Sequence, residues 1–130
     1  MLKSLLSVIA GVIAGVVVIS LAEGVMGTIY TFPEGTDMNN MEALKAAIAL
    51  MPAGAFLMVM GGHLIGSMAS GMVASLIMKT SIRPALICGG IFTAFGLINL
   101  ISIGTHPWWM WTELALYLPM AYLGHKIVTK

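Results

Sequence analysis

Residues 51–79 form the apolar run that most constrains how this chain folds. The run reads MPAGAFLMVMGGHLIGSMASGMVASLIMK, and between its ends the only polar side chains are one imidazole and three hydroxyls. A helix of about 20 apolar residues is long enough to cross the hydrocarbon core of a bilayer. The run therefore predicts a membrane-spanning helix whose polar side chains must face protein groups or water rather than lipid.

Small residues recur along this run in steps of three and four: Gly62, Gly66, Ser67, Ser70, Gly71, Ala74 and Ser75. In a membrane, such rows let neighbouring helices approach closely. We expect this helix to be the packing centre of the chain. The row favours packing inside a helix bundle over a seam between two copies.

The composition places the whole chain in a bilayer. Of 130 residues, 59% are hydrophobic and 8% are charged, which leaves too little charge for the surface of a soluble domain. Four spans with short connectors use nearly all of the chain, so we expect one domain over residues 1–130, an all-α integral membrane bundle of four transmembrane helices. The net charge of +1, without a basic cluster, argues against nucleic acid and leaves the lipid bilayer as the expected partner.

The four spans are expected at residues 4–31, 51–79, 84–103 and 108–128. Pro33 and Gly35 end the first, and Pro84 is well placed to begin the third. Residues 38–50 are amphipathic. The sequence leaves open whether they lie at the membrane interface or extend the second helix as far as Pro52.

The cations predict the orientation in the membrane. One side of the predicted topology carries Lys3, Lys79, Arg83, Lys126 and Lys130, and the other carries Lys45 with three acids, Glu34, Asp37 and Glu42. Because cytoplasmic loops are enriched in lysine and arginine, both termini are expected in the cytoplasm.

Polar side chains from all four predicted spans fall at similar depth below the outer surface. The predicted ligand-binding residues are Glu23, His63, Asn99 and Glu113, with Tyr30, Ser67 and Tyr117 beside them, and His106 near the mouth. Two carboxylates and an imidazole suit an outward-facing pocket for a cation or small molecule, as in a transporter. They are also the candidate metal ligands (Glu23, His63 and Glu113), with the identity of any metal or cofactor open.

Other readings of the same residues remain. In a structural network, Glu23 pairs with His63, and Asn99 or Tyr117 caps Glu113, which fixes the order of the helices. The protein would then be a non-enzymatic accessory subunit of a larger membrane complex, or a homo-oligomer. An enzyme is disfavoured because the sequence has no HExxH, ExxH or paired-histidine spacing.

The chain resembles small, uncharacterised bacterial four-helix membrane proteins in three short motifs: Tyr30-x-x-Pro33-x-Gly35-x-Asp37, Pro52-Ala53-Gly54 and His106-Pro107-Trp108. The resemblance covers most of the chain and implies the four-helix architecture but no activity. The layout is also similar to that of small multidrug transporters, which have four helices and a glutamate in the first. This chain differs from them in its long acidic first connector and lacks their other motifs.

The cation distribution makes a topology prediction. Cysteines introduced by Thr36→Cys and Thr80→Cys should differ in their reaction with a membrane-impermeant thiol reagent added to intact cells, position 36 being labelled and position 80 protected. Labelling of position 80 from outside would contradict the orientation.

Overall fold

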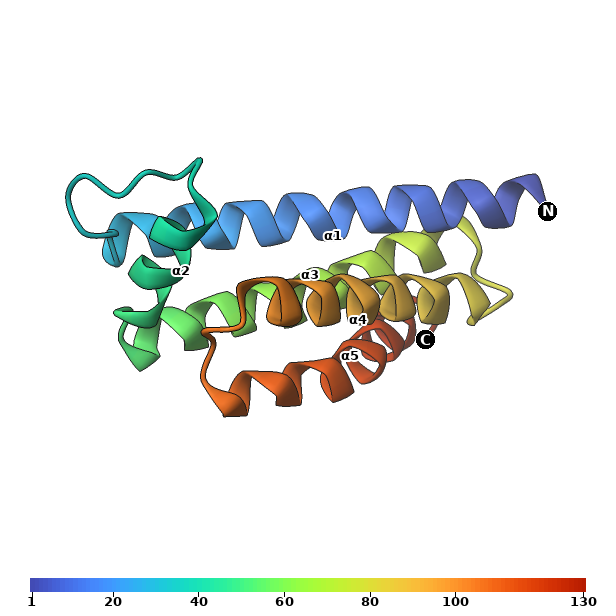
Figure 1. Cartoon of the computed structure of the whole chain (residues 1–130). Helices are drawn as coiled ribbons and strands as arrows, with labels where there is room; N and C mark the ends of the chain where they lie inside the picture. Colours follow the sequence, from blue (N-terminus) through green and yellow to red (C-terminus); the bar gives the residue numbers. More distant parts are fainter.

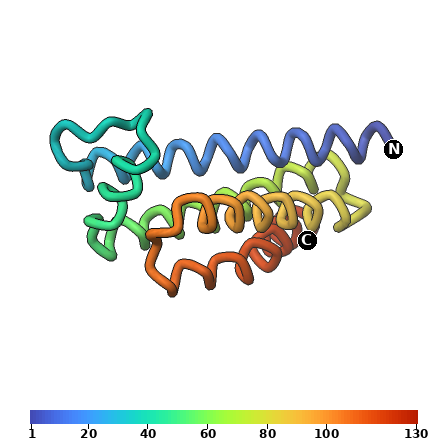
Figure 2. The backbone as a smooth tube through the Cα atoms, in the orientation of Figure 1, coloured from blue at the N-terminus to red at the C-terminus, as the bar shows by residue number.

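The computed structural model describes residues 1–130 and consists of helices, without strands. In chain order they are α1 (Leu2–Ile29), α2 (Met41–Ala49), α3 (Ala53–Ile77), α4 (Arg83–Ile103), the short 3₁₀ segment η1 (Trp108–Thr112) and α5 (Glu113–Val128). The four long helices lie side by side (Figure 1), and the path of the chain between them is clear in the tube of Figure 2. The predicted all-α class is confirmed.

Three of these helices, α1, α3 and α4, are long and apolar enough to cross a membrane. Their bounds lie within two residues of the expected spans. The fourth expected span, 108–128, has a different form. Its first five residues, Trp108–Thr112, are a 3₁₀ segment, and the α-helix that follows has 16 residues.

Proline and glycine set the ends of α3 and α4. Pro52, with extended backbone, caps the start of α3, and Pro84 lies in the first turn of α4, where its missing N–H removes no helical bond. Gly104 ends α4 with a φ of 71°, and its N–H donates to the carbonyl of Leu100 at 3.0 Å. Such a left-handed residue is a common end for a helix, and glycine adopts it without steric cost.

The amphipathic segment contains a separate helix, α2. The side chain of Asn40 accepts hydrogen bonds from the N–H groups of Glu42 and Ala43, at 3.0 and 3.2 Å, and so caps the start of α2. Residues 50–52 are not helical, so α2 does not continue into α3. Figure 1 shows α2 folded back beside the end of the bundle.

Helix α3 is the centre of the packing, in contact with α1, α4 and α5. Its small residues allow this, because Gly66 lies against the backbone of Gly15 in α1, and Gly71 against that of Ala121 in α5. All seven residues of the row are buried within the chain. The row therefore serves packing inside one molecule.

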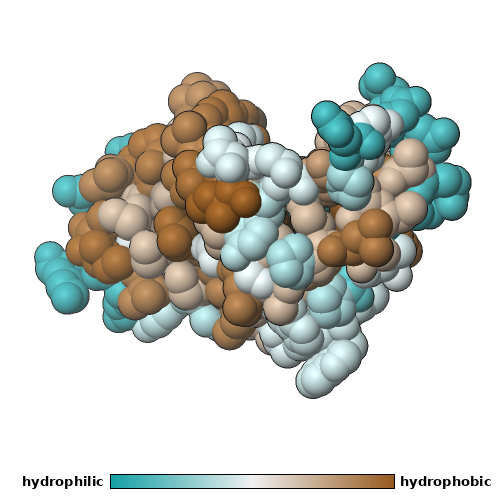
Figure 3. Space-filling model, turned by 90° about the vertical axis from the view of Figure 1, so that its left-hand side faces the viewer, coloured by the Kyte–Doolittle hydropathy of each residue, from teal (hydrophilic) through white to brown (hydrophobic).

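The two ends of the bundle differ. Both termini and the turn between α3 and α4 lie at one end, whereas the 30–40 connector, α2 and the connector before η1 lie at the other (Figure 1). Figure 3 looks onto the second end, where a hydrophilic corner and a hydrophobic region flank a notch in the outline. Glu34, Asp37 and Glu42 are exposed at this end.

The contact between α3 and α5 gives a stability prediction. A methyl group at Gly71 would overlap the backbone carbonyl of Ala121, which cannot move without shifting α5. Gly71→Ala should therefore lower the free energy of unfolding in detergent by about 1–3 kcal/mol. Gly90→Ala, on an exposed face of α4 with open space around it, is the matched control and should change little. Equal melting temperatures for the two variants would contradict this packing.

Candidate functional site

His63, in the middle of α3, is the centre of the polar site. Its Nε2 lies 3.2 Å from Oε1 of Glu23 in α1, and its Nδ1 lies 3.3 Å from Oε2 of Glu113 in α5. In Figure 1, α1 lies on one side of α3 and α5 on the other. One imidazole thus connects two carboxylates from helices on two sides of the central helix.

These two contacts set the smallest number of protons that the cluster holds. A bare ring nitrogen facing an ionised carboxylate would bring two lone pairs together, so each contact requires a shared proton. With two shared protons, the ring carries both between two carboxylates, or one carboxyl group is protonated beside a neutral ring. Glu23, His63 and Glu113 together therefore carry at most a single negative charge.

The hydrogen-bond network continues from His63 through Tyr117 and Ser67 and ends at Ser70. The hydroxyl of Tyr117 lies 3.1 Å from Nδ1 of His63, and the hydroxyl of Ser67 donates to the carbonyl of Tyr117 at 2.8 Å. The next hydroxyl, that of Ser70, donates to the carbonyl of Ser67 at 2.8 Å. Carbonyl oxygens have no proton to pass on, so these serines end the network rather than extend it toward the other end of the bundle.

The two carboxylates have different surroundings. The Glu113 side chain is 1% exposed, whereas the Glu23 side chain is 50% exposed. The first is a buried partner of His63 that no ligand reaches without moving the helices. The second is available to a ligand.

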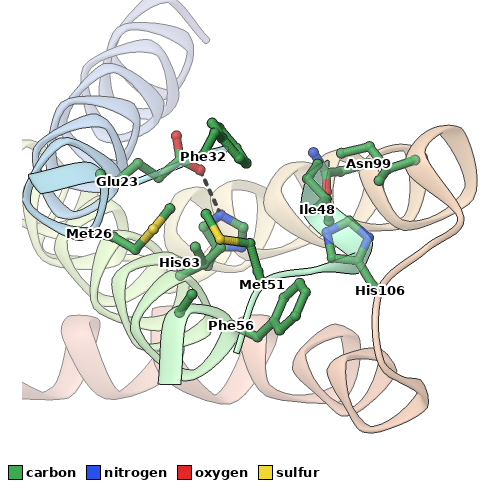
Figure 4. A pocket seen from close by; sticks show the side chains of 13 residues that line it. Glu23, Met26, Phe32, Ile48, Met51, Phe56, His63, Asn99 and His106 are labelled. Atoms are coloured by element: carbon green, nitrogen blue, oxygen red, sulfur yellow. Dashed lines mark hydrogen bonds and ion pairs between the residues drawn. The ribbon is translucent and has the colours of Figure 1, made fainter. Parts of the chain in front are cut away.

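Glu23 and His63 lie in the wall of a pocket of about 310 Å³ at the end of the bundle that carries α2. The pocket is lined by residues of α1, α2, α3, α4 and the connectors between them. Figure 4 shows Glu23 and Asn99 on opposite sides of this pocket, with His63 between them and joined to Glu23. Apart from its polar side chains, Glu23, His63, Asn99 and His106, the lining is mostly apolar, with Met26, Phe32, Ile48, Met51 and Phe56 among it.

His106, in the connector that follows α4, lines one side of the pocket. Its ring packs edge-on against Phe56, with the ring centroids 5.9 Å apart, and its Nδ1 is buried without a hydrogen-bond partner. Burial lowers the pKa of His106, and the charge of Glu113 opposes that shift. The ring is therefore neutral near pH 7.

The structure brings five of the seven predicted site residues into one cluster: Glu23, His63, Ser67, Glu113 and Tyr117. Asn99 lines the same pocket as Glu23 but makes no side-chain hydrogen bond within the chain. Tyr30 lies apart, in a shallow pocket between the 30–34 segment and residues 47–52, with its hydroxyl against Gly54.

The candidate metal ligands, Glu23, His63 and Glu113, do not surround a common point. The two glutamates contact different nitrogens of one ring, and these nitrogens point in different directions. No group of three or more His, Cys, Asp or Glu side chains is arranged to hold a metal ion.

Sequence reasoning did not find the apolar walls of the pocket. Phe32, Ile48 and Met51 reach it because the chain folds back between α1 and α3, and nothing in their local sequence indicates this contact. It also missed the hydrogen bond from α3 to α5 at the other end of the bundle, where the Ser75 hydroxyl lies 2.9 Å from Nδ1 of His125.

Comparison with protein-family models, curated proteins and solved structures finds no match to this chain.

The unequal exposure of the two carboxylates predicts unequal costs of substitution. Glu113→Gln should lower the free energy of unfolding in detergent by about 1–3 kcal/mol, because it removes the charge on a buried partner of His63. Glu23→Gln should cost less, since half of its side chain is exposed and less of its environment depends on the contact with His63. Glu42→Gln, on the exposed face of α2, is the control and should be neutral. Equal destabilisation by Glu113→Gln and Glu42→Gln would contradict the buried contact.

Proposed function

We propose that this protein binds an organic cation in the pocket lined by Glu23, His63, Asn99 and His106, here named the cation pocket, from the outer side of a bacterial inner membrane. In this proposal α5 is the fourth span, beside α3 and α4, and α2 lies at the outer membrane surface. The five cations at the end that holds both termini support cytoplasmic termini, and the acidic connector at the other end then faces outward.

One observation carries this proposal, the half-exposed carboxylate of Glu23 in the wall of an otherwise mostly apolar pocket. No lysine or arginine of the chain lies within salt-bridge distance of this carboxylate, and the imidazole of His63 is its one partner of that kind. A charge that is poorly solvated by its surroundings is costly and marks a functional site in membrane proteins. A bound cation would neutralise it.

The lining favours an organic cation over a metal ion. Both nitrogens of His63 are already occupied by carboxylates, so a metal ion entering the pocket would find Glu23 and few other charged ligands. An ammonium group on an organic scaffold gains the charge of Glu23 and also contacts the rings of Phe32 and Phe56. The volume, about 310 Å³, is that of a small-molecule site.

The proposal extends from binding to transport if the bound cation is released on the inner side of the membrane. The cation pocket lies at one end of the bundle, and toward the other end α1 and α3 are in close contact at Gly15 and Gly66. A transporter would have to separate these helices to release a ligand on the inner side. Uptake of the bound cation into vesicles distinguishes transport from binding alone.

A structural role is the second candidate, and the burial of Glu113 favours it. In this reading the Glu23–His63–Glu113 cluster only holds α1, α3 and α5 together. The protein would be an accessory subunit whose α2 or exposed α1 surface contacts a larger complex.

A binding measurement separates the two functions. Benzyltrimethylammonium should bind the purified protein in lipid nanodiscs, and Glu23→Gln should weaken the affinity at least about tenfold, because the variant loses the counter-ion. Glu42→Gln removes an acid from the same end of the molecule outside the pocket and should bind like the parent. Melting curves of the same samples show whether each variant is folded.

Two results would refute the pocket. One is equal affinity of the parent and Glu23→Gln. The other combines two findings: benzyltrimethylammonium does not bind, and the losses of stability caused by Glu23→Gln and by His63→Ala are strongly non-additive in the double variant. Together these findings would identify the cluster as a structural network.

A further inference from the structure

A second cavity, the side pocket, adjoins the cation pocket between α1 and α4. Its volume is about 190 Å³, and it shares two lining residues with the cation pocket, His63 and Asn99. The rest of its lining comes mainly from α1 (Val16, Ile19 and Ser20) and α4 (Phe92, Phe95 and Gly96). His63 and Asn99 therefore lie in the wall of both cavities, which are direct neighbours.

From His63 and Asn99 the side pocket extends toward the middle of the bundle. Its α1 residues come before Glu23 in the sequence, and its other α4 residues come before Asn99. Because α1 and α4 run in the same direction in Figure 1, both sets lie on the same side of His63, away from the α2 end. Val16 lies seven residues before Glu23, which corresponds to about 10 Å along the helix. The two cavities therefore lie in a row along α1 and α4, with the carboxylate of Glu23 in the wall of the one nearer the α2 end.

The side pocket opens sideways. Val16 and Phe95, on its two flanks, are 44% and 53% exposed on the lateral surface. Val16 lies in the middle of α1, a candidate membrane span, so the side pocket faces acyl chains rather than water. An apolar group enters such an opening directly from the bilayer.

We infer that the ligand is an amphiphilic cation with a single alkyl tail, whose ammonium group lies at Glu23 and whose tail lies in the side pocket between α1 and α4. This inference rests on the proposed cation binding and adds the chemical class of the ligand and its route. The mostly apolar lining beyond His63 and Asn99 suits an alkyl chain, and the charged head remains at the end of the bundle nearest the aqueous phase.

Two probes with the same head group test this assignment in nanodiscs. Ethyltrimethylammonium fills only the cation pocket, whereas octyltrimethylammonium also reaches the side pocket. Ser20→Phe places a ring at the side pocket, and Phe95→Ala removes one of its flanks. Ser20→Phe should weaken octyltrimethylammonium roughly tenfold because its ring fills the space of the tail. Phe95→Ala should weaken it by a similar factor because it removes apolar contacts of the tail, while ethyltrimethylammonium binds to both variants as before. Leu21→Phe, an exposed neighbour that lines neither cavity, should leave both affinities unchanged.

The outcomes separate this inference from the function on which it rests. Glu23-dependent binding of both probes, with no selective loss of octyltrimethylammonium in Ser20→Phe or Phe95→Ala, refutes the side pocket and leaves cation binding intact. A loss in Leu21→Phe as large as in Ser20→Phe also refutes it, because the effect would then come from the bilayer. If neither probe shows Glu23-dependent binding, both the proposed cation site and the inference about the side pocket are refuted.

Discussion

The structure depends on one imidazole placed between two carboxylates. Neither Glu23 nor Glu113 has a lysine or arginine within salt-bridge distance, so His63 is the group that makes both acids tolerable among apolar helices. Because each ring nitrogen serves one acid, the cluster spans the central helix. The same feature that joins α1, α3 and α5 leaves two acids with one imidazole, and only the carboxylate of Glu23, in α1, is exposed.

The close packing of α3 is what allows this geometry. A side chain on a central helix reaches acids on two neighbours only if both neighbours lie near, and glycine permits that approach on both sides. Gly62 and Gly66 face Ala22 and Ile19 of α1, while Gly71 faces Ala121 of α5. Bulkier residues would move the outer helices away and stretch both contacts beyond hydrogen-bonding distance.

The sequence indicated most of the helices because apolar runs and proline positions are local signals, and α1, α3 and α4 follow them closely. The segment expected as the fourth span could not be predicted as well, since the tight 3₁₀ turn at Trp108–Thr112 has no distinct sequence signature. Counting residues along each expected helix placed Glu23, His63 and Glu113 at similar depth, and so predicted that they lie close together. It could not show that one ring contacts both acids, nor that Tyr30 turns away, since these depend on packing angles and on the fold-back of residues 30–52.

The spacing of the cluster along the chain has a consequence for biogenesis. Glu23 precedes His63 by 40 residues, and Glu113 follows it by 50. During synthesis α1 enters the bilayer with an acid that has no partner until α3 arrives, and His63 then meets Glu23 first. Glu113 comes last, when the ring already has one carboxylate. Packing of α5 against α3 thus completes the cluster, and a nascent chain stopped before it would hold a half-formed cluster that quality-control proteases could distinguish from the finished protein.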